Sequence, residues 1–118
     1  MRAFPAWIAA ALLTSTAAGA QVPPPPIPLE EGHALALALC SVCHLAAPDQ
    51  IGVPVMTNPG PPFRTIANLP GVDAIFLRNF LTTAHSTTMP PFTMPNPELS
   101  SRQIDAMIVY ILSLRGQP

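Results

Sequence analysis

Apolar residues recur at helical spacing in four segments of this chain. The segments run from Leu29 to Val42, from Phe63 to Asn68, from Val72 to Leu81, and from Ser100 to Arg115 and Gly116. Spacings of three and four residues are typical of helices that bury one face. No segment alternates apolar and polar residues over enough length to predict a sheet. The pattern therefore predicts an all-α fold with three to four helices and proline-rich loops.

The first predicted helix is rich in alanine and leucine, which favour helices. Glu30 and Glu31 suit its N-terminal end, where the helix dipole is positive. His33 also lies on this helix, and we expect it to be solvated and not a ligand. Three large apolar residues share one face, which we expect to be buried: Leu35, Leu39 and Val42.

The last predicted helix begins with a capping box, in which the side chains of Ser100 and Gln103 bind each other's backbone N–H groups. Arg115 and Gly116 suit its C-terminal end. Its apolar stripe consists of Ile104, Met107, Ile108, Ile111 and Leu112.

The N-terminus has the pattern of a secretory signal. Arg2 precedes an apolar run from Ala6 to Leu13, and a stretch of small residues ends at Ala20. The run is too short to span a bilayer, which takes roughly 20 apolar residues. We therefore expect residues 1–20 to be removed from a periplasmic chain without a membrane span, whereas an uncut signal would anchor it. Residues 21–29 are proline-rich and predict a stiff tether, with or without a docking role, before one domain at residues 30–118.

Charged residues are sparse. The chain has five arginines, no lysine and six acidic residues, for a net charge of −1, or −2 once Arg2 is removed with the signal. The sequence has no basic patch for nucleic acid. A domain of this size buries only about two thirds of its unfolded surface, and few aromatic residues are present to fill a core. We expect a bound group to complete the interior.

One short motif carries the candidate chemistry. Cys40-Ser41-Val42-Cys43-His44 has the CxxCH spacing, in which two thiols bond covalently to haem and the adjacent imidazole coordinates its iron. Two intervening residues place both sulfurs at one porphyrin edge, and the next residue then lies beneath the metal. The motif predicts one covalently bound haem c, held by Cys40 and Cys43, with His44 as an axial ligand.

Three other interpretations of the cysteine pair fit the sequence less well. A thioredoxin-like dithiol needs a βαβ pattern, which is lacking. A structural zinc site needs four ligands, usually in paired motifs, and no second CxxC or HxxxH follows. A disulfide gains little stability here because the loop that it closes is short.

With these residues placed, the chain resembles class I c-type cytochromes from about Gly32 to Leu114. In that family a small residue at the position of Gly32 often lets the first and last helices touch, and Tyr110 resembles the aromatic residue that meets it. Gly60-Pro61-Pro62-Phe63 is similar to the family's GPxL or GPxF loop. The resemblance implies that the Pro61 carbonyl accepts a hydrogen bond from His44 and orients its ring.

The resemblance further implies that the helices wrap around the haem. After the Pro70-Gly71 turn, four apolar residues at helical spacing are expected to form the wall of the haem pocket: Ile75, Phe76, Phe80 and Leu81.

The resemblance also implies a second axial ligand, a methionine followed by proline. Met94 precedes Leu99 and Tyr110 in the chain. In many relatives the ligand precedes the corresponding leucine and tyrosine by the same distances. We therefore favour Met94 as the ligand and keep Met89 as the alternative, because its position shortly after His85 is also seen in relatives. His85 itself is a third candidate. A thioether ligand stabilises ferrous iron and suits single-electron transfer.

Iron with six ligands has no open position at which a small molecule can bind, so the remaining chemistry is electron transfer at an exposed haem edge. The resemblance therefore implies an electron carrier and not an enzyme. The expected partners are a periplasmic dehydrogenase and a terminal oxidase or reductase, and the expected state is a monomer. Without lysines, we expect docking through an apolar rim of prolines and methionines that depends weakly on salt. Two alternatives stay open: a haem subunit or module of a larger oxidoreductase, and a five-coordinate haem sensor or small peroxidase.

Overall fold

The computed structural model describes residues 23, 25–83 and 96–117. Within these ranges the chain is helical and has no strand, which confirms the all-α prediction. The elements are α1 (Leu29–Leu35), the π-helical turn η1 (Ala36–Cys40), α2 (Phe63–Asn68), α3 (Ala74–Thr83) and α4 (Ser101–Ser113). Over the same residues, no helix combines the length and hydrophobicity that a membrane span requires. The predicted signal and the candidate ligands His85, Met89 and Met94 lie outside the described residues.

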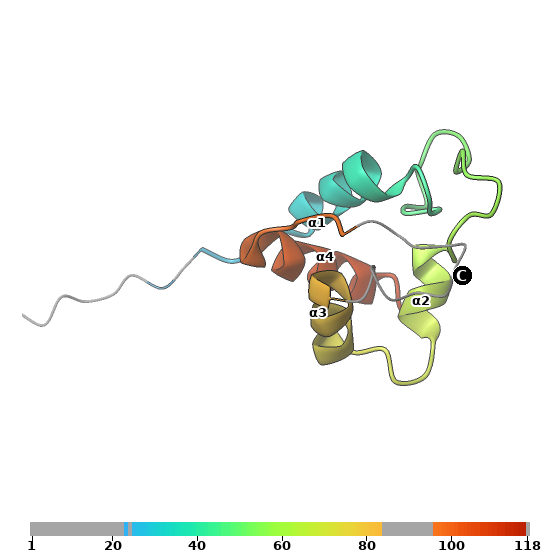
Figure 1. Ribbon diagram of the computed structural model, residues 1–118. Coiled ribbons are helices and arrows are strands. Elements are labelled where there is room, and N and C mark those ends of the chain that lie inside the picture. Colours follow the sequence, from blue (N-terminus) through green and yellow to red (C-terminus); the bar gives the residue numbers. More distant parts are fainter. Residues whose placement is uncertain (1–22, 24, 84–95, 118) are drawn as a thin grey trace, which may run out of the picture.

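The helix α4 organises the fold. In Figure 1 it lies among α1, α2 and α3, and it packs against all three. The capping box predicted at its start is present, with Ser100 Oγ accepting a hydrogen bond from Gln103 N at 3.3 Å. Four residues of the predicted stripe are buried, Ile104, Met107, Ile108 and Ile111, and the fifth, Leu112, is partly buried. Ala106 and Tyr110 are buried as well. The predicted apolar face of this helix is thus confirmed as the centre of the core.

The first and last helices touch at a glycine, as the resemblance implies. A Cβ atom at residue 32 would lie 2.5 Å from the Cβ of Tyr110 and 2.8 Å from the carbonyl carbon of Ala106. Only glycine lets the two backbones approach this closely. The contact fixes the direction of α1, and η1 then carries Cys40 into the core, where it is buried.

The first helix differs from the prediction in its end and in its buried face. Regular α-helix ends at Leu35 and the helical segment ends at Cys40, so the predicted extension to Val42 is wrong. Leu39 and Val42 are each about half exposed, which corrects their predicted burial. The buried stripe consists instead of small residues: Gly32, Ala36 and Cys40. Close packing against α4 requires small side chains at the contact, whereas the periodicity rule favours large ones.

The helix α3 begins later than the predicted start at Val72, because Asp73 caps it. The carboxylate Oδ1 of Asp73 accepts a hydrogen bond from Phe76 N at 2.8 Å. Leu77 and Leu81 are buried in the core, while Phe76 is exposed and stacks on Phe80 with ring centroids 6.0 Å apart. Ile75 is exposed as well. The predicted wall residues therefore divide between core and surface, and Leu77 takes a core position that the prediction omits.

Candidate functional site

The segment from Cys40 to His44 forms a tight turn that begins at the last residue of η1. The carbonyl of Cys40 accepts hydrogen bonds from the backbone N–H groups of Cys43 at 3.1 Å and of His44 at 2.8 Å. Ser41 Oγ donates to the carbonyl of Leu37 at 2.6 Å, which ties the turn to η1. One turn of backbone therefore carries both thiols and the imidazole, and we call residues 40–44 the attachment turn.

The two thiols of the attachment turn are not joined by a disulfide. Burial, and to a smaller extent the neighbouring Cys43 thiol, raises the pKa of Cys40 to about 11. A thiol with so high a pKa is neutral at neutral pH and is a poor nucleophile, whereas the reactive cysteine of a dithiol enzyme has a lowered pKa. The surroundings of Cys40 thus do not support the thioredoxin-like interpretation.

His44 is 6% exposed, and its ring is held by the loop that precedes α2. Its Nδ1 donates a hydrogen bond to the Pro61 carbonyl at 2.8 Å. Because a carbonyl can only accept, Nδ1 carries the proton, and Nε2 is the nitrogen with the lone pair that a metal takes. The hydrogen bond between His44 and Pro61 that the resemblance implies is thus present in the structure. Phe63 packs beside the ring, with centroids 5.3 Å apart.

Backbone hydrogen bonds on both sides of His44 hold this loop in place. Gly60 N donates to the carbonyl of Cys43 at 2.8 Å, and Phe63 N donates to the carbonyl of Leu45 at 3.0 Å. The loop is thus paired with the residue before the histidine and with the residue after it. This pairing holds the Pro61 carbonyl in position for the ring.

After His44 the chain continues as a short segment, residues 45–50, which we call the strap. Ala46 is 0% exposed, and side chains bind both of its backbone polar groups. Its N–H donates to Gln50 Oε1 at 2.8 Å, and its carbonyl accepts from Tyr110 Oη at 3.1 Å. Neither Gln50 nor the hydroxyl of Tyr110 is part of the motif, and no spacing in the sequence marks these contacts.

His33 joins α1 to the strap, while about 32% of its side chain remains exposed to solvent. Its Nε2 lies 2.7 Å from Asp49 Oδ1, and its ring meets Tyr110 edge to face with centroids 5.4 Å apart. The hydrogen bond from His33 is the main cause that lowers the pKa of Asp49. The residue therefore has a structural role, anchoring the segment that follows His44.

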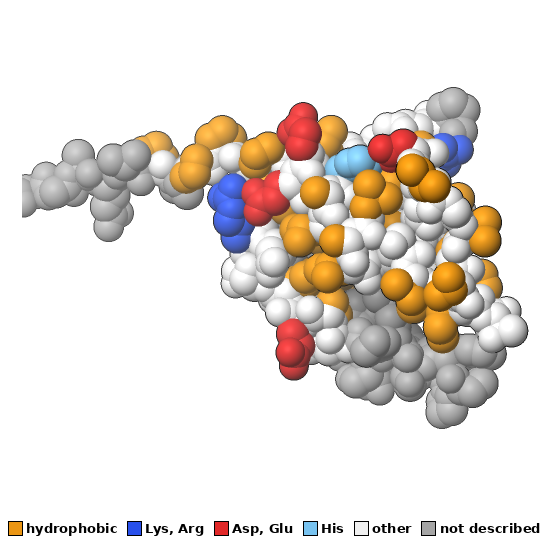
Figure 2. Space-filling view, turned by 90° about the horizontal axis from the view of Figure 1, so that it is seen from above, with side chains coloured by type: hydrophobic (Ala, Val, Ile, Leu, Met, Phe, Trp, Pro, Cys, Tyr) orange, Lys and Arg blue, Asp and Glu red, His pale blue; other side chains and the backbone are white. Residues whose placement is uncertain are grey.

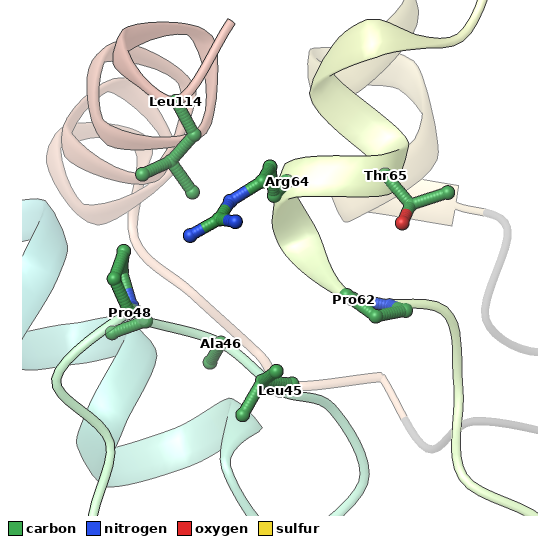
Figure 3. Close-up of a pocket in the computed structure, with 8 residues that line it drawn as sticks. Leu45, Ala46, Pro48, Pro62, Arg64, Thr65 and Leu114 are labelled. Atoms are coloured by element: carbon green, nitrogen blue, oxygen red, sulfur yellow. The ribbon is translucent and has the colours of Figure 1, made fainter. Parts of the chain in front are cut away.

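The strap also borders a cavity of about 260 Å³. In Figure 3, Arg64 extends into it from α2, and Leu114 lines it from the end of α4. Cys40, Cys43 and His44 are not among its lining residues. The cavity is thus distinct from the attachment turn.

The attachment turn fits a covalently bound haem in its chemistry. It supplies two thiols outside a disulfide and an imidazole whose Nδ1 is fixed by a carbonyl. These are the donors that haem c requires: two sulfurs for its side groups and one oriented nitrogen for its iron.

A sequence model of one protein family, described as Cytochrome c, matches residues 29–115, which is most of the chain. The matched range contains the attachment turn, the strap, the loop with Pro61 and α4. No curated protein matches the chain, and no solved structure matches it.

Proposed function

The chain belongs to the cytochrome c family and is a haem-binding electron carrier, and we propose that it passes single electrons between redox partners in the periplasm. The family binds haem c covalently, and one haem is typical of a domain of this size. Haem supplies one-electron chemistry at its iron. The observation that carries the proposal is the 2.8 Å hydrogen bond from His44 Nδ1 to the Pro61 carbonyl, on the turn that also holds Cys40 and Cys43.

The two cysteines and the histidine of the attachment turn have separate roles in this proposal. Cys40 and Cys43 would form the covalent bonds to the haem, and His44 would bind its iron through Nε2. The Pro61 carbonyl fixes the plane of the His44 ring and increases its strength as a donor. Met94 is the proposed second axial ligand, with Met89 as the alternative.

The proposed docking surface is the apolar loop of residues 51–56. Val55 N donates to the carbonyl of Val42 at 3.1 Å, so the loop lies against the residue between the two cysteines. Val53 and Val55 are each 80% exposed, and Ile51 is fully exposed. No charged residue occurs between Asp49 and Arg64. Exposed apolar side chains in this number are typical of an interaction surface.

The charge of the molecule supports the same mode of docking. On the face shown in Figure 2, charged side chains are few and include a positive and a negative group side by side, and hydrophobic ones are spread among them. Long-range attraction needs a concentrated field of one sign, which this distribution does not supply. We therefore propose partners with an apolar, weakly charged docking face: a periplasmic dehydrogenase as donor and a terminal oxidase or reductase as acceptor.

Visible and near-infrared spectroscopy of the holoprotein, made in a periplasm that has haem-attachment machinery, tests the proposal. We expect covalent haem and the near-infrared sulfur-to-iron band in the oxidised wild type. Met94→Ala should lose that band, and Met89→Ala, the matched control, should keep it. The reverse result would assign the ligand to Met89. Wild type without covalent haem would overturn the proposal.

Carbon monoxide separates the carrier from a five-coordinate sensor or peroxidase. A six-coordinate carrier in its reduced form should not bind carbon monoxide at neutral pH, whereas a five-coordinate haem would. Gel filtration of the holoprotein from the periplasm addresses the remaining alternative. A free monomer supports the carrier, and elution only within a larger complex supports a subunit of an oxidoreductase.

A further inference from the structure

The side chain of Gln50 connects Ser41, inside the attachment turn, with Ala46 of the strap. Its Oε1 accepts a hydrogen bond from Ala46 N at 2.8 Å, and its Nε2 donates to the carbonyl of Ser41 at 3.4 Å. Ser41 lies between the two cysteines, and Ala46 lies shortly after His44. A single amide group thus connects the backbone before the second cysteine with the backbone after the histidine.

The surroundings of the bridge make its position well defined. Gln50 N donates to the carbonyl of Ala47 at 3.2 Å, which folds the strap back toward the turn. Ala46 is fully buried, so its N–H depends on a protein partner. Its carbonyl is fixed separately by Tyr110 Oη at 3.1 Å. The backbone of Ala46 is therefore held by Gln50 through its N–H and by Tyr110 of α4 through its carbonyl.

The bridge requires the chemistry of glutamine. Binding to Ala46 needs an acceptor and binding to Ser41 needs a donor, and a side-chain amide has both. A carboxylate of the same length could accept from Ala46 but could not donate to Ser41. An apolar side chain of similar length could make neither bond. Substitutions of Gln50 can therefore test its hydrogen bonds to Ala46 and to Ser41 separately.

We propose that Gln50 is a positioning residue for haem attachment and for the orientation of His44. By fixing Ser41 relative to Ala46, it holds both thiols and the imidazole in the single arrangement that one haem can bind. The inference rests on the proposed function, because it assumes that Cys40, Cys43 and His44 hold the haem. It extends that function to a residue outside the motif.

The experiment compares wild type with Gln50→Met and Gln50→Glu, all expressed as holoprotein in the periplasm. Gln117→Met is the matched control, because Gln117 Nε2 donates to the carbonyl of Ser113, at the end of α4. Three quantities are measured: the ratio of covalent haem to polypeptide, the hydrogen-exchange rate of the Ala46 amide, and the NMR shifts of the His44 ring in the oxidised protein.

We expect Gln50→Met to have less covalent haem per chain, displaced His44 signals, and an Ala46 amide that exchanges about tenfold faster, as the loss of one hydrogen bond implies. Gln50→Glu should restore slow exchange at Ala46 but keep displaced His44 signals, because only the bond to Ser41 is lost. Gln117→Met should match wild type in all three measurements.

The inference is overturned if Gln50→Met equals wild type in haem content, exchange and ring shifts. If Gln50→Met does not accumulate, Gln50→Glu decides, and the inference fails if that variant does not accumulate either or shows wild-type ring shifts. A wild-type protein without covalent haem would instead overturn the proposed function, so the two failures are distinguishable.

Discussion

Gly60 lies against the imidazole of His44, so closely that a Cβ atom at residue 60 would stand 2.6 Å from Nδ1 and 2.9 Å from Nε2. The same residue donates its N–H to the carbonyl of Cys43 at 2.8 Å. The ring and the loop therefore cannot move independently. Any side chain at residue 60 must displace the ring or break the pairing of the loop with the attachment turn.

Gly60→Ala should accordingly destabilise the holoprotein by about 1–3 kcal/mol, the usual range for overpacking a well-packed site. The displaced His44 ring should also lose its hydrogen bond to Pro61. Denaturant unfolding measures the free energy, and NMR of the oxidised protein measures the ring shift. Val53→Ala is the control, because it shortens a side chain that is 80% exposed. Wild-type stability and ring shifts in Gly60→Ala would contradict the prediction.

Gly32→Ala should destabilise the protein by a similar amount, about 1–3 kcal/mol, through a different contact. The added methyl group would lie 2.5 Å from the Cβ of Tyr110, so α1 must move away from α4. Thermal unfolding of the holoprotein checks this expectation. Ala34→Ser changes an exposed position of the same helix and should have little effect. If the two variants unfold at the same temperature, the close helix contact is not important for stability.

Much of this architecture could be predicted because it depends on local rules. The capping box at Ser100 and Gln103 and the apolar stripe of α4 follow from side-chain type and helical period. The CxxCH spacing likewise places Cys40, Cys43 and His44 on one turn. The hydrogen bond from His44 to Pro61 does not follow from such a local rule, because only the resemblance to a family connects these two residues.

Other features could not be predicted because they depend on contacts between distant residues. Close packing against α4 selects small residues for the buried stripe of α1, and the period rule gives such residues little weight. The bonds from His33 to Asp49 and from Tyr110 to Ala46 join residues that have no regular spacing. Isolated polar residues such as Gln50 therefore gain their roles only from the fold.

The stability of the protein should depend on pH through Asp49. Its pKa lies below the ordinary value of 3.8, mainly because His33 donates a hydrogen bond to the carboxylate. A carboxyl group with a lowered pKa in the folded state stabilises that state above its unfolded pKa, and the contribution disappears as the pH falls through the folded value. Asp49→Asn should thus be less stable than wild type at pH 6, and the difference should vanish in stronger acid.

Denaturant unfolding over a series of pH values measures this difference. His33→Phe is the matched variant, since it keeps a ring against Tyr110 but removes the hydrogen bond to Asp49. In that background Asp49→Asn should have no additional effect. A difference between Asp49→Asn and wild type that persists in strong acid would show that the carboxylate acts other than through its charge.

Docking through the apolar loop predicts electron exchange that is insensitive to salt. Two copies of the holoprotein, one oxidised and one reduced, are a defined partner pair, and NMR line widths give their self-exchange rate. From ~0.01 M to ~1 M salt the Debye length falls from about 30 Å to about 3 Å, so charge-driven association would change steeply over this range. The wild-type rate should change little, because the loop of residues 51–56 has no charged side chain.

A lysine within the loop should create the salt dependence that wild type lacks. Val53→Lys places a positive charge on the loop of each copy, and these charges repel each other when two copies dock through their loops. Electron exchange should therefore be slower at low salt and recover as salt is added. Val109→Lys adds the same charge at a position on α4 that is 42% exposed, and it should change the rate much less. If both lysine variants behave alike, net charge and not the loop controls the encounter. A steep salt dependence in wild type would place docking on a charged surface instead.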